Sequence, residues 1–276
     1  MTKTVLITGA SEGIGLETAK LYAEEGAKLI LVARHDAKLR AAAACLNAHA
    51  GVETHALDLS DAAALERFLG DLDARQVAVD VVVNNAGHGA SGAFLEAEWT
   101  KLDAMLRLNM NALARITHWA VQRMNAAGGG AVVNLSAAVA TRPTPHFAAY
   151  AASKAFVTNL SIALHKELAG TGVTVSAIHP PAVRTNFADA DRADLRSTLV
   201  LKLFPSVGPQ TVARAVLSAA RRGRRSVIVG PIAGIVMGTA PILPRSFDLA
   251  FMTLLFKGRR TAAPEPMMMM SRDGGR

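Results

Sequence analysis

The fold class of this chain is decided by the stretch Thr8-Gly9-Ala10-Ser11-Glu12-Gly13-Ile14-Gly15. It follows an apolar run at 4–7 that is typical of a buried strand, and it opens a helical stretch at 14–25. Glycines let an anion approach the backbone closely, and the helix N-terminus supplies N–H groups and the positive end of the helix dipole. The glycine spacing is G-x-x-x-G-x-G, which differs from the common G-x-G-x-x-G fingerprint. We expect this turn to hold the phosphates of a nucleotide through Gly9, Ser11, Glu12, Gly13, Ile14 and Gly15.

The same alternation of strand and helix continues along the chain. Six further short runs rich in Val, Ile and Leu lie at 29–33, 52–57, 79–84, 131–135, 173–178 and 227–229. Four helical stretches lie between the first five of these runs, at 37–48, 62–74, 99–127 and 148–169. Repeated strand–helix–strand units form right-handed crossovers and a parallel sheet that is covered on both faces. We therefore expect an α/β chain with a single doubly wound, Rossmann-type sheet of about seven strands.

The pattern changes near the C-terminus. The segment 226–244 carries no charged residue, but Pro231, Pro241 and Pro244 would interrupt a membrane-spanning helix. We expect two short apolar helices within 231–258, the second through 247–256, covering the substrate cleft or a subunit interface. Contact with a membrane surface is the alternative. One domain is expected over 1–258, and a disordered tail over 259–276.

Composition excludes several classes of protein. Half of the 276 residues are apolar, which is enough for a large core, and the single cysteine, Cys45, excludes a disulfide scaffold. No metal-ligand spacing exists among the eight histidines. The net charge of +8 lies wholly in residues 213–276, around an apolar segment, so we expect no nucleic-acid partner. A lone thiol and a first strand that begins near residue 3 favour the cytoplasm.

The end of the second predicted strand indicates which nucleotide binds. An acidic residue there would hold a ribose 2′-hydroxyl, but this chain has Arg34. An arginine makes charge-assisted hydrogen bonds to a 2′-phosphate, which favours NADP(H) over NAD(H). Glu12, a negative charge within the glycine turn, argues mildly against that preference.

A tyrosine and a lysine follow the fifth predicted strand in Tyr150-Ala151-Ala152-Ser153-Lys154. Residues four apart on a helix lie on one face, and an ammonium group beside a phenol lowers the pKa of that phenol. Tyr150 is therefore a candidate proton donor and acceptor near neutral pH.

These motifs together resemble the short-chain dehydrogenase/reductase family in its single-domain, NAD(P)-dependent branch, over roughly 3–230. The resemblance rests on six motifs in order: 8–15, Asp58-Leu59, Asn84-Asn85-Ala86-Gly87, Asn109, Tyr150 with Lys154, and 179–185. It implies that Asp58 and Leu59 bind adenine, and that Asn85, Ala86 and Gly87 line the adenosine ribose.

The resemblance also implies the roles of the remaining site residues. Tyr150 would be the catalytic acid/base, and Lys154 would bind the nicotinamide ribose. Asn109 would hold a water molecule that links Lys154 to solvent. In the loop after the sixth strand, the nicotinamide would be positioned by Pro180, Val183 and Thr185.

The chain departs from the family pattern at two positions. The family places a carbonyl-orienting serine thirteen residues before the tyrosine, where this chain has Ala137. Ser136 is one residue early, and neighbouring residues of a strand face opposite sides unless a bulge intervenes. We take Ser136 as the candidate catalytic hydroxyl, and the other possible donors are His88, Thr141, Thr144 and His146. The second departure is Pro181 in place of a glycine beside the nicotinamide.

The sequence therefore predicts an NADP(H)-dependent oxidoreductase that interconverts a ketone or aldehyde with an alcohol by hydride transfer. The apolar C-terminal helices favour a lipophilic small-molecule substrate. Family members commonly form dimers or tetramers through the helices that here contain Asn109 and Lys154. The alternative is an NADP(H)-binding sensor or scaffold that is catalytically impaired because Ala137 occupies the serine position.

Overall fold

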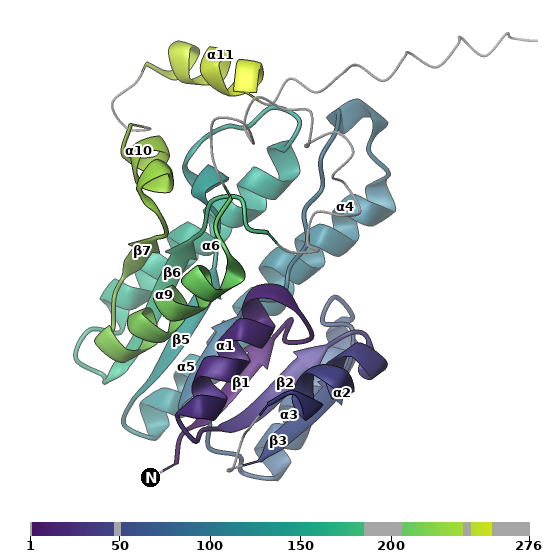
Figure 1. The fold of residues 1–276 in the computed structure, drawn as a ribbon, viewed down its shortest axis with the longest axis vertical. Helices are drawn as coiled ribbons and strands as arrows, with labels where there is room; N and C mark the ends of the chain where they lie inside the picture. The colour runs from purple at the N-terminus through teal and green to yellow at the C-terminus, as the bar shows by residue number, and fades with distance from the viewer. Residues whose placement is uncertain (1, 47–50, 185–205, 240–243, 256–276) are drawn as a thin grey trace, which may run out of the picture.

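The computed structural model describes residues 2–46, 51–184, 206–239 and 244–255. Seven parallel strands form one sheet in the order β3-β2-β1-β4-β5-β6-β7 (Figure 1). They are β1 (Thr4–Thr8), β2 (Lys28–Ala33), β3 (Val52–Ala56), β4 (Val81–Asn84), β5 (Gly130–Leu135), β6 (Val173–His179) and β7 (Ser226–Ile228). This order reverses direction between β1 and β4, and such a switch point is where doubly wound folds bind ligands. The predicted fold class and all seven predicted strands are confirmed.

Helices cover both faces of the sheet. One core packs β1, β2, β4 and β5 against α1 (Gly13–Glu24), α2 (Asp36–Ala44) and α9 (Pro209–Arg222). The other core lies under α3 (Ala62–Ala74), α5 (Leu113–Ala126) and α6 (Ala148–Glu167). The first core contains residues such as Ile7 and Leu31, and the second contains Leu6 and Ile30, because successive strand residues face opposite sides. Runs that are apolar at every position are thus explained by burial on both faces.

Local signals set several helix ends. The carboxylate of Asp61 accepts hydrogen bonds from the backbone N–H groups of Ala63 and Ala64 and caps α3. Helix α9 has Pro209 at its first turn and ends at Gly223, which adopts the left-handed conformation.

The predicted long helix at 99–127 is not continuous. It consists of α4 (Trp99–Leu106), a π-helical turn η2 (Arg107–Ala112) and α5. A π-turn inserts one extra residue per turn and is common at functional sites. A periodicity of 3.6 residues does not reveal such a turn, so the sequence predicted one uninterrupted helix.

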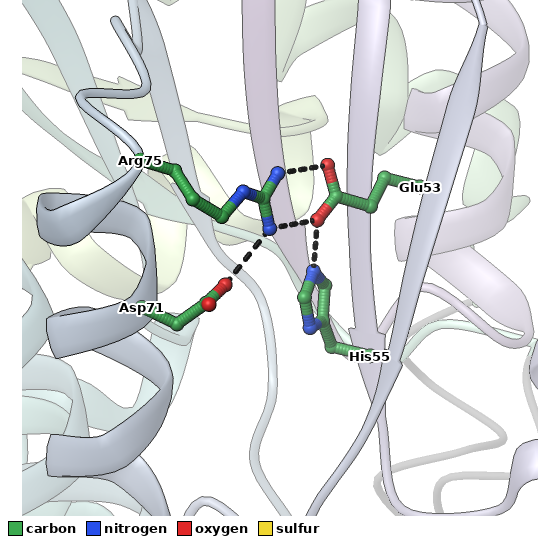
Figure 2. Close-up of polar contacts among 4 residues, drawn as sticks. All are labelled: Glu53, His55, Asp71 and Arg75. Atoms are coloured by element: carbon green, nitrogen blue, oxygen red, sulfur yellow. Dashed lines mark hydrogen bonds and ion pairs between the residues drawn. The ribbon is translucent and has the colours of Figure 1, made fainter.

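A polar cluster ties α3 to the edge strand β3 (Figure 2). Both guanidinium Nη atoms of Arg75 donate to the carboxylate of Glu53, at 2.7 and 2.9 Å. Arg75 also contacts Asp71 at 2.8 Å, and His55 Nε2 lies 2.7 Å from Glu53 Oε1. The hydrogen bonds from Arg75 lower the pKa of Glu53 to about 2, against the effect of its partial burial. The cluster thus ties the C-terminal end of α3 to β3.

The C-terminal part contains the two short helices that the sequence predicts, α10 (Pro231–Thr239) and α11 (Arg245–Leu255). In Figure 1 both lie toward the carboxyl end of the strands. A buried ion pair joins Asp248 of α11 to Arg142, which follows the 3-10 turn η3 (Ala138–Thr141). Across the described ranges, no helix combines the length and apolar character needed to cross a bilayer. The predicted tail at 259–276 lies outside the described residues.

Candidate active site

The loops after β1 and β4 are fastened to each other at the switch point. Thr8 Oγ1 accepts hydrogen bonds from the backbone N–H groups of Asn85 and Ala86, at 3.0 and 2.9 Å. In return, Asn85 Nδ2 donates to the carbonyls of Thr8 and Gly9, both at 3.0 Å. The side chain of Asn85 therefore shapes the glycine turn. Its amide is bound to the backbone of that turn, while the sequence motif suggested only a wall beside the ribose.

The glycine turn has the geometry that an anion requires. Gly9 and Gly13 have φ of +64° and +59°, and a Cβ on Gly15 would lie 2.2 Å from the carbonyl oxygen of Gly9. The N-cap residue of α1, Glu12, makes no side-chain capping hydrogen bond. The first N–H groups of α1 consequently point toward the carboxyl end of β1 without a side-chain cap, which fits the phosphates of a dinucleotide. Glu12 itself lies 3.5 Å from Lys38, which offsets part of its charge.

Arg34 follows the end of β2 and Asp58 follows the end of β3, close enough that the charge of Arg34 acts on the Asp58 carboxylate. Burial by itself raises the pKa of Asp58, but hydrogen bonds from Ser60 and the charge of Arg34 lower it below its ordinary value. Ser60 N and Ser60 Oγ both donate to Asp58 Oδ1, at 2.9 and 2.7 Å. Leu59 is buried, and Arg34 is exposed. An exposed cation beside an ionised carboxylate suits recognition of the adenosine end of a dinucleotide.

Asn109 and Lys154 approach Gly87, and the ring of Tyr150 lies near Lys154. A Cβ on Gly87 would lie 2.9 Å from Asn109 Oδ1 and 3.5 Å from Lys154 Nζ. Lys154 Nζ donates to the carbonyl of Leu135 at 2.8 Å and lies 5.8 Å from the centre of the Tyr150 ring. The structure thus brings Tyr150, Lys154 and Asn109 together where β4 and β5 end.

The π-turn η2 positions Asn109. Its Nδ2 donates to the His88 carbonyl at 3.0 Å and to Ser153 Oγ at 3.2 Å, and its Oδ1 accepts from His88 N at 3.1 Å. Ser153 Oγ donates in turn to the Tyr150 carbonyl at 2.7 Å. Asn109 therefore acts as a brace between the loop after β4 and helix α6, beside Lys154.

Burial governs the ionisation of the pair on α6. It lowers the pKa of Lys154 to about 8 and raises the pKa of Tyr150 well above its ordinary value. Both shifts favour the uncharged form of the group, as expected on removal from water. The predicted lowering of the Tyr150 pKa by Lys154 is therefore wrong: burial raises this pKa, and Tyr150 holds its proton at neutral pH.

The hydroxyl of Ser136 faces helix α6. Its hydroxyl donates to the Lys154 carbonyl at 2.9 Å, contacts Thr158 Oγ1 at 2.7 Å and is buried. It follows Asn134, whose side chain also faces α6 through Ser161, so strand alternation continues to Ser136 without a bulge. A hydroxyl has one hydrogen, and that of Ser136 is bound to α6. Ala137, the next residue, is buried and immediately precedes η3.

The loop after β6 is partly described. Ala138 N donates to the carbonyl of Pro180 at 2.9 Å, and Val183 forms an isolated parallel bridge with Val207. These contacts hold the loop beside Ala137 in spite of Pro181. Thr185 lies outside the described residues.

Reasoning from the sequence missed two groups near the site. Ser153 links Asn109 to the backbone of Tyr150. The sequence signal for this role was a hydroxyl residue between Tyr150 and Lys154 in the motif. Arg142 gives no local signal, because its partner Asp248 is 106 residues away.

Comparison with known proteins agrees with this geometry. A family model described as short chain dehydrogenase matches residues 3–196. The chain belongs to the short-chain dehydrogenase family. Its sheet has the switch point at which doubly wound folds bind nucleotides.

Relatives in the short-chain dehydrogenase family differ in length. The probable oxidoreductase EphD of Mycobacterium tuberculosis is 34% identical over 256 residues, which are 88% of this chain and 43% of EphD. The chain thus spans less than half the length of this relative. The 3-oxoacyl-[acyl-carrier-protein] reductase FabG of Chlamydia trachomatis is 30% identical over 249 residues, 87% of this chain and 98% of FabG.

Solved structures of the family share the fold. A short-chain dehydrogenase from Sphingobium yanoikuyae in complex with NADPH superposes with a TM-score of 0.74 at 30% identity. The match covers 88% of this chain and 97% of that chain.

Proposed function

We propose that this chain is an NADP(H)-dependent carbonyl reductase that acts on a lipophilic ketone or aldehyde. The observation that carries the proposal is the approach of Asn109 and Lys154 to Gly87, with the ring of Tyr150 5.8 Å from Lys154 Nζ. A phenol, an ammonium group and an amide brace in one place are suited to proton transfer to a carbonyl oxygen.

Tyr150 is the proton donor in this proposal. Its phenol holds a proton at neutral pH, as reduction of a carbonyl requires, and burial raises its pKa further. With NADP(H) as cofactor, reduction is the physiological direction in this proposal. When bound, the nicotinamide supplies the hydride. The ammonium group of Lys154 stabilises the phenolate that remains on Tyr150, and Asn109 holds the loop that carries His88 beside it.

NADP(H) is the proposed cofactor because of Arg34. It is exposed at the end of β2, and Lys38 lies beside the opposing charge of Glu12. The related protein from Sphingobium yanoikuyae was solved with NADPH, which supports the same preference. Guanidinium groups bind phosphate monoesters through paired, charge-assisted hydrogen bonds.

Further features belong to the same proposal. The reductase is one domain over 1–258 and resides in the cytoplasm. It assembles as a homo-oligomer through the helices that carry Asn109 and Lys154, and the exposed side chain of Trp99 at the start of α4 supports an interface there. Contact between α10 and the η3 turn puts apolar residues near the site, which supports a lipophilic substrate.

Oxidation of NADPH over a panel of lipophilic ketones and aldehydes tests the proposal. We expect turnover by the wild type and a loss of at least about 1000-fold for Tyr150→Phe, which removes the proton donor. Unchanged turnover in Tyr150→Phe would refute the assigned role.

A non-catalytic sensor or scaffold is the second candidate. It is favoured because residue 137 is an alanine without a hydroxyl and because the hydroxyl of Ser136 donates to the Lys154 carbonyl. Tight binding of NADPH without turnover on any carbonyl would support it. Recovery of turnover in Ala137→Ser alone would show that the natural chain has lost its chemistry.

A further inference from the structure

We infer that Asp248, in the C-terminal helix α11, is a positioning residue for Tyr150. Its ion pair with Arg142 fixes the segment 142–147, and this segment sets the start of helix α6, which carries Tyr150. The role assigned to Asp248 in catalysis rests on the proposed function, in which Tyr150 donates the proton. The effect of Asp248 on the ring of Tyr150 is tested without any substrate.

The ion pair between Asp248 and Arg142 is withdrawn from water. The two side chains are 8% and 1% exposed, respectively. An arginine stays charged even when it is buried, and the carboxylate of Asp248 supplies a counter-charge to its guanidinium group. A buried ion pair adds little net stability over apolar side chains of the same volume, but removal of one partner is costly. The position of Arg142 therefore depends on α11, although the two residues lie 106 positions apart.

A continuous path of hydrogen bonds leads from Arg142 to the first turn of α6. Thr144 Oγ1 donates to the Arg142 carbonyl at 3.1 Å, and the Thr144 carbonyl accepts from Phe147 N at 3.0 Å. Phe147 is the N-cap residue of α6, and its carbonyl accepts from Ala151 N at 2.8 Å. Thr144 is buried, so its hydrogen bonds are shielded from water. A shift of Arg142 is therefore passed on to the point where α6 begins.

The sequence of the segment limits its ability to absorb such a shift. Pro143 and Pro145 lie on either side of Thr144. A proline ring fixes its own φ and restricts the backbone of the preceding residue. Arg142 has the extended backbone angles that this restriction favours, with φ of −137° and ψ of 142°. The segment 142–147 is thus a stiff connection between the ion pair and helix α6.

The start of α6 orients the ring of Tyr150. The rings of Phe147 and Tyr150 meet edge to face, with their centres 6.3 Å apart and their planes at 68°. Aromatic pairs prefer a defined geometry, so the position of Phe147 influences that of the phenol ring. A misplacement of about 1 Å at a reacting group can cost about 100-fold in rate. An influence of Asp248 on the reaction therefore does not require contact between Asp248 and the substrate.

Fluorine NMR tests the effect on the ring. The chain contains two tyrosines, Tyr22 and Tyr150, so labelling with fluorotyrosine gives one signal for each. Tyr22→Phe assigns them, and it should leave the fold intact because the Tyr22 hydroxyl makes no hydrogen bond to any described residue. Asp248→Asn keeps the shape of the side chain and removes its charge. We expect it to shift or broaden the Tyr150 signal and to leave the Tyr22 signal in place.

A second variant makes the same comparison more gently. Arg142→Lys keeps the positive charge but loses the planar fork of the guanidinium group. It should move the Tyr150 signal in the same direction by a smaller amount. Should Asp248→Asn fail to fold, Arg142→Lys decides the question alone.

Kinetics test the role in catalysis. Asp248→Asn should lower kcat about tenfold or more and leave the Kd for NADPH unchanged, because the glycine turn and Arg34 lie outside the segment 142–147. Leu72→Ala is the matched control for lost stability, since Leu72 is fully buried in α3 and its truncation leaves a cavity. Assayed well below its Tm, this control should alter neither kcat nor the Tyr150 signal.

Three results would overturn the inference. The first is a Tyr150 signal that stays in place in the folded Asp248→Asn or Arg142→Lys variant. The second is an equal shift, or an equal loss of kcat, in Leu72→Ala, which would trace the effect to lower stability. The third is a shifted Tyr150 signal with an unchanged kcat. No turnover by the wild type would instead refute the proposed function, and the fluorine signal would still decide whether Asp248 positions Tyr150.

Discussion

The hydroxyl of Ser136 donates to the main-chain carbonyl of Lys154, at 2.9 Å, inside the contact between β5 and α6. Ser136, the residue before Ala137, therefore packs the end of β5 against helix α6. Ala137, which immediately precedes η3, occupies the position where the family pattern has a serine.

Ala137→Ser should raise turnover of a carbonyl substrate by about 10- to 100-fold, because it restores a hydrogen-bond donor for the carbonyl oxygen. Ala137 has extended backbone angles and precedes η3, a setting that serine tolerates well. Steady-state oxidation of NADPH measures the effect. Ser136→Ala is the matched control and should reduce stability more than turnover. A larger loss of turnover in Ser136→Ala than gain in Ala137→Ser would contradict the assignment.

Gly87→Ala should lower kcat by about 10- to 100-fold, because the new Cβ would lie 2.9 Å from Asn109 Oδ1 and displace the brace beside Lys154. Gly70→Ala, in the middle of α3, meets no atom within 4 Å and serves as the control. It should keep full activity and unfold at the same or a higher temperature. Equal kcat values for the two variants would show that the packing around Gly87 has no catalytic role.

Arg34→Ala should raise the Kd for NADPH by about 10- to 100-fold and leave the Kd for NADH nearly unchanged, since only NADPH carries a 2′-phosphate. Fluorescence titration of the two cofactors measures both constants. Arg40→Ala removes an exposed cation of α2 that pairs with Asp36, and it should alter neither constant by much. A parallel weakening of both cofactors in Arg34→Ala would refute the assigned preference.

Lys154→Met should abolish most activity and yet raise the apparent Tm of the cofactor-free protein by about 2–4 °C near pH 7. Burial lowers the pKa of Lys154 to about 8, whereas in the unfolded chain the amine keeps its ordinary, higher pKa. Burial of the charged ammonium group therefore lowers the free energy of unfolding by its full amount below about pH 8, and this loss of stability declines as the pH rises above 8. The gain from Met should shrink over the same range in thermal scans. A gain that is independent of pH would exclude the buried charge as its cause.

Glu53→Gln should lower the Tm by about 2–4 °C at pH 7, because it removes the charge that Arg75 and His55 contact. The pKa of Glu53 is lowered to about 2, so its contribution is present above the ordinary pKa of a glutamate. That contribution is lost as the pH falls toward 2, and the two Tm values should converge. Glu66→Gln, in the more exposed pair with Arg115, is the control and should shift the Tm less. A constant difference down to pH 3 would contradict the mechanism.

Local sequence patterns determined the strands and the class of sheet of this protein. Runs such as 4–7 and 131–135 are apolar at every position, so they become strands wherever two faces are covered. The turn from Thr8 to Gly15 and the four-residue spacing of Tyr150 and Lys154 depend on backbone geometry and helical periodicity alone. The sequence therefore predicted the strands, the class of sheet and the elements that carry the site.

Tertiary structure decided what depends on contacts between distant residues. In the π-turn, Asn109 accepts a hydrogen bond from His88 N and donates one to Ser153 Oγ, and these partners lie 21 and 44 residues away. The hydroxyl of Ser136 is bound by α6, 18 residues on, and Asp248 finds Arg142 across 106 residues. Such contacts are set by how elements pack and by the need to satisfy buried polar groups, and no local periodicity encodes either. The sequence by itself determined where the reactive groups lie in the chain, and only the packing of the elements decided which of them face one another.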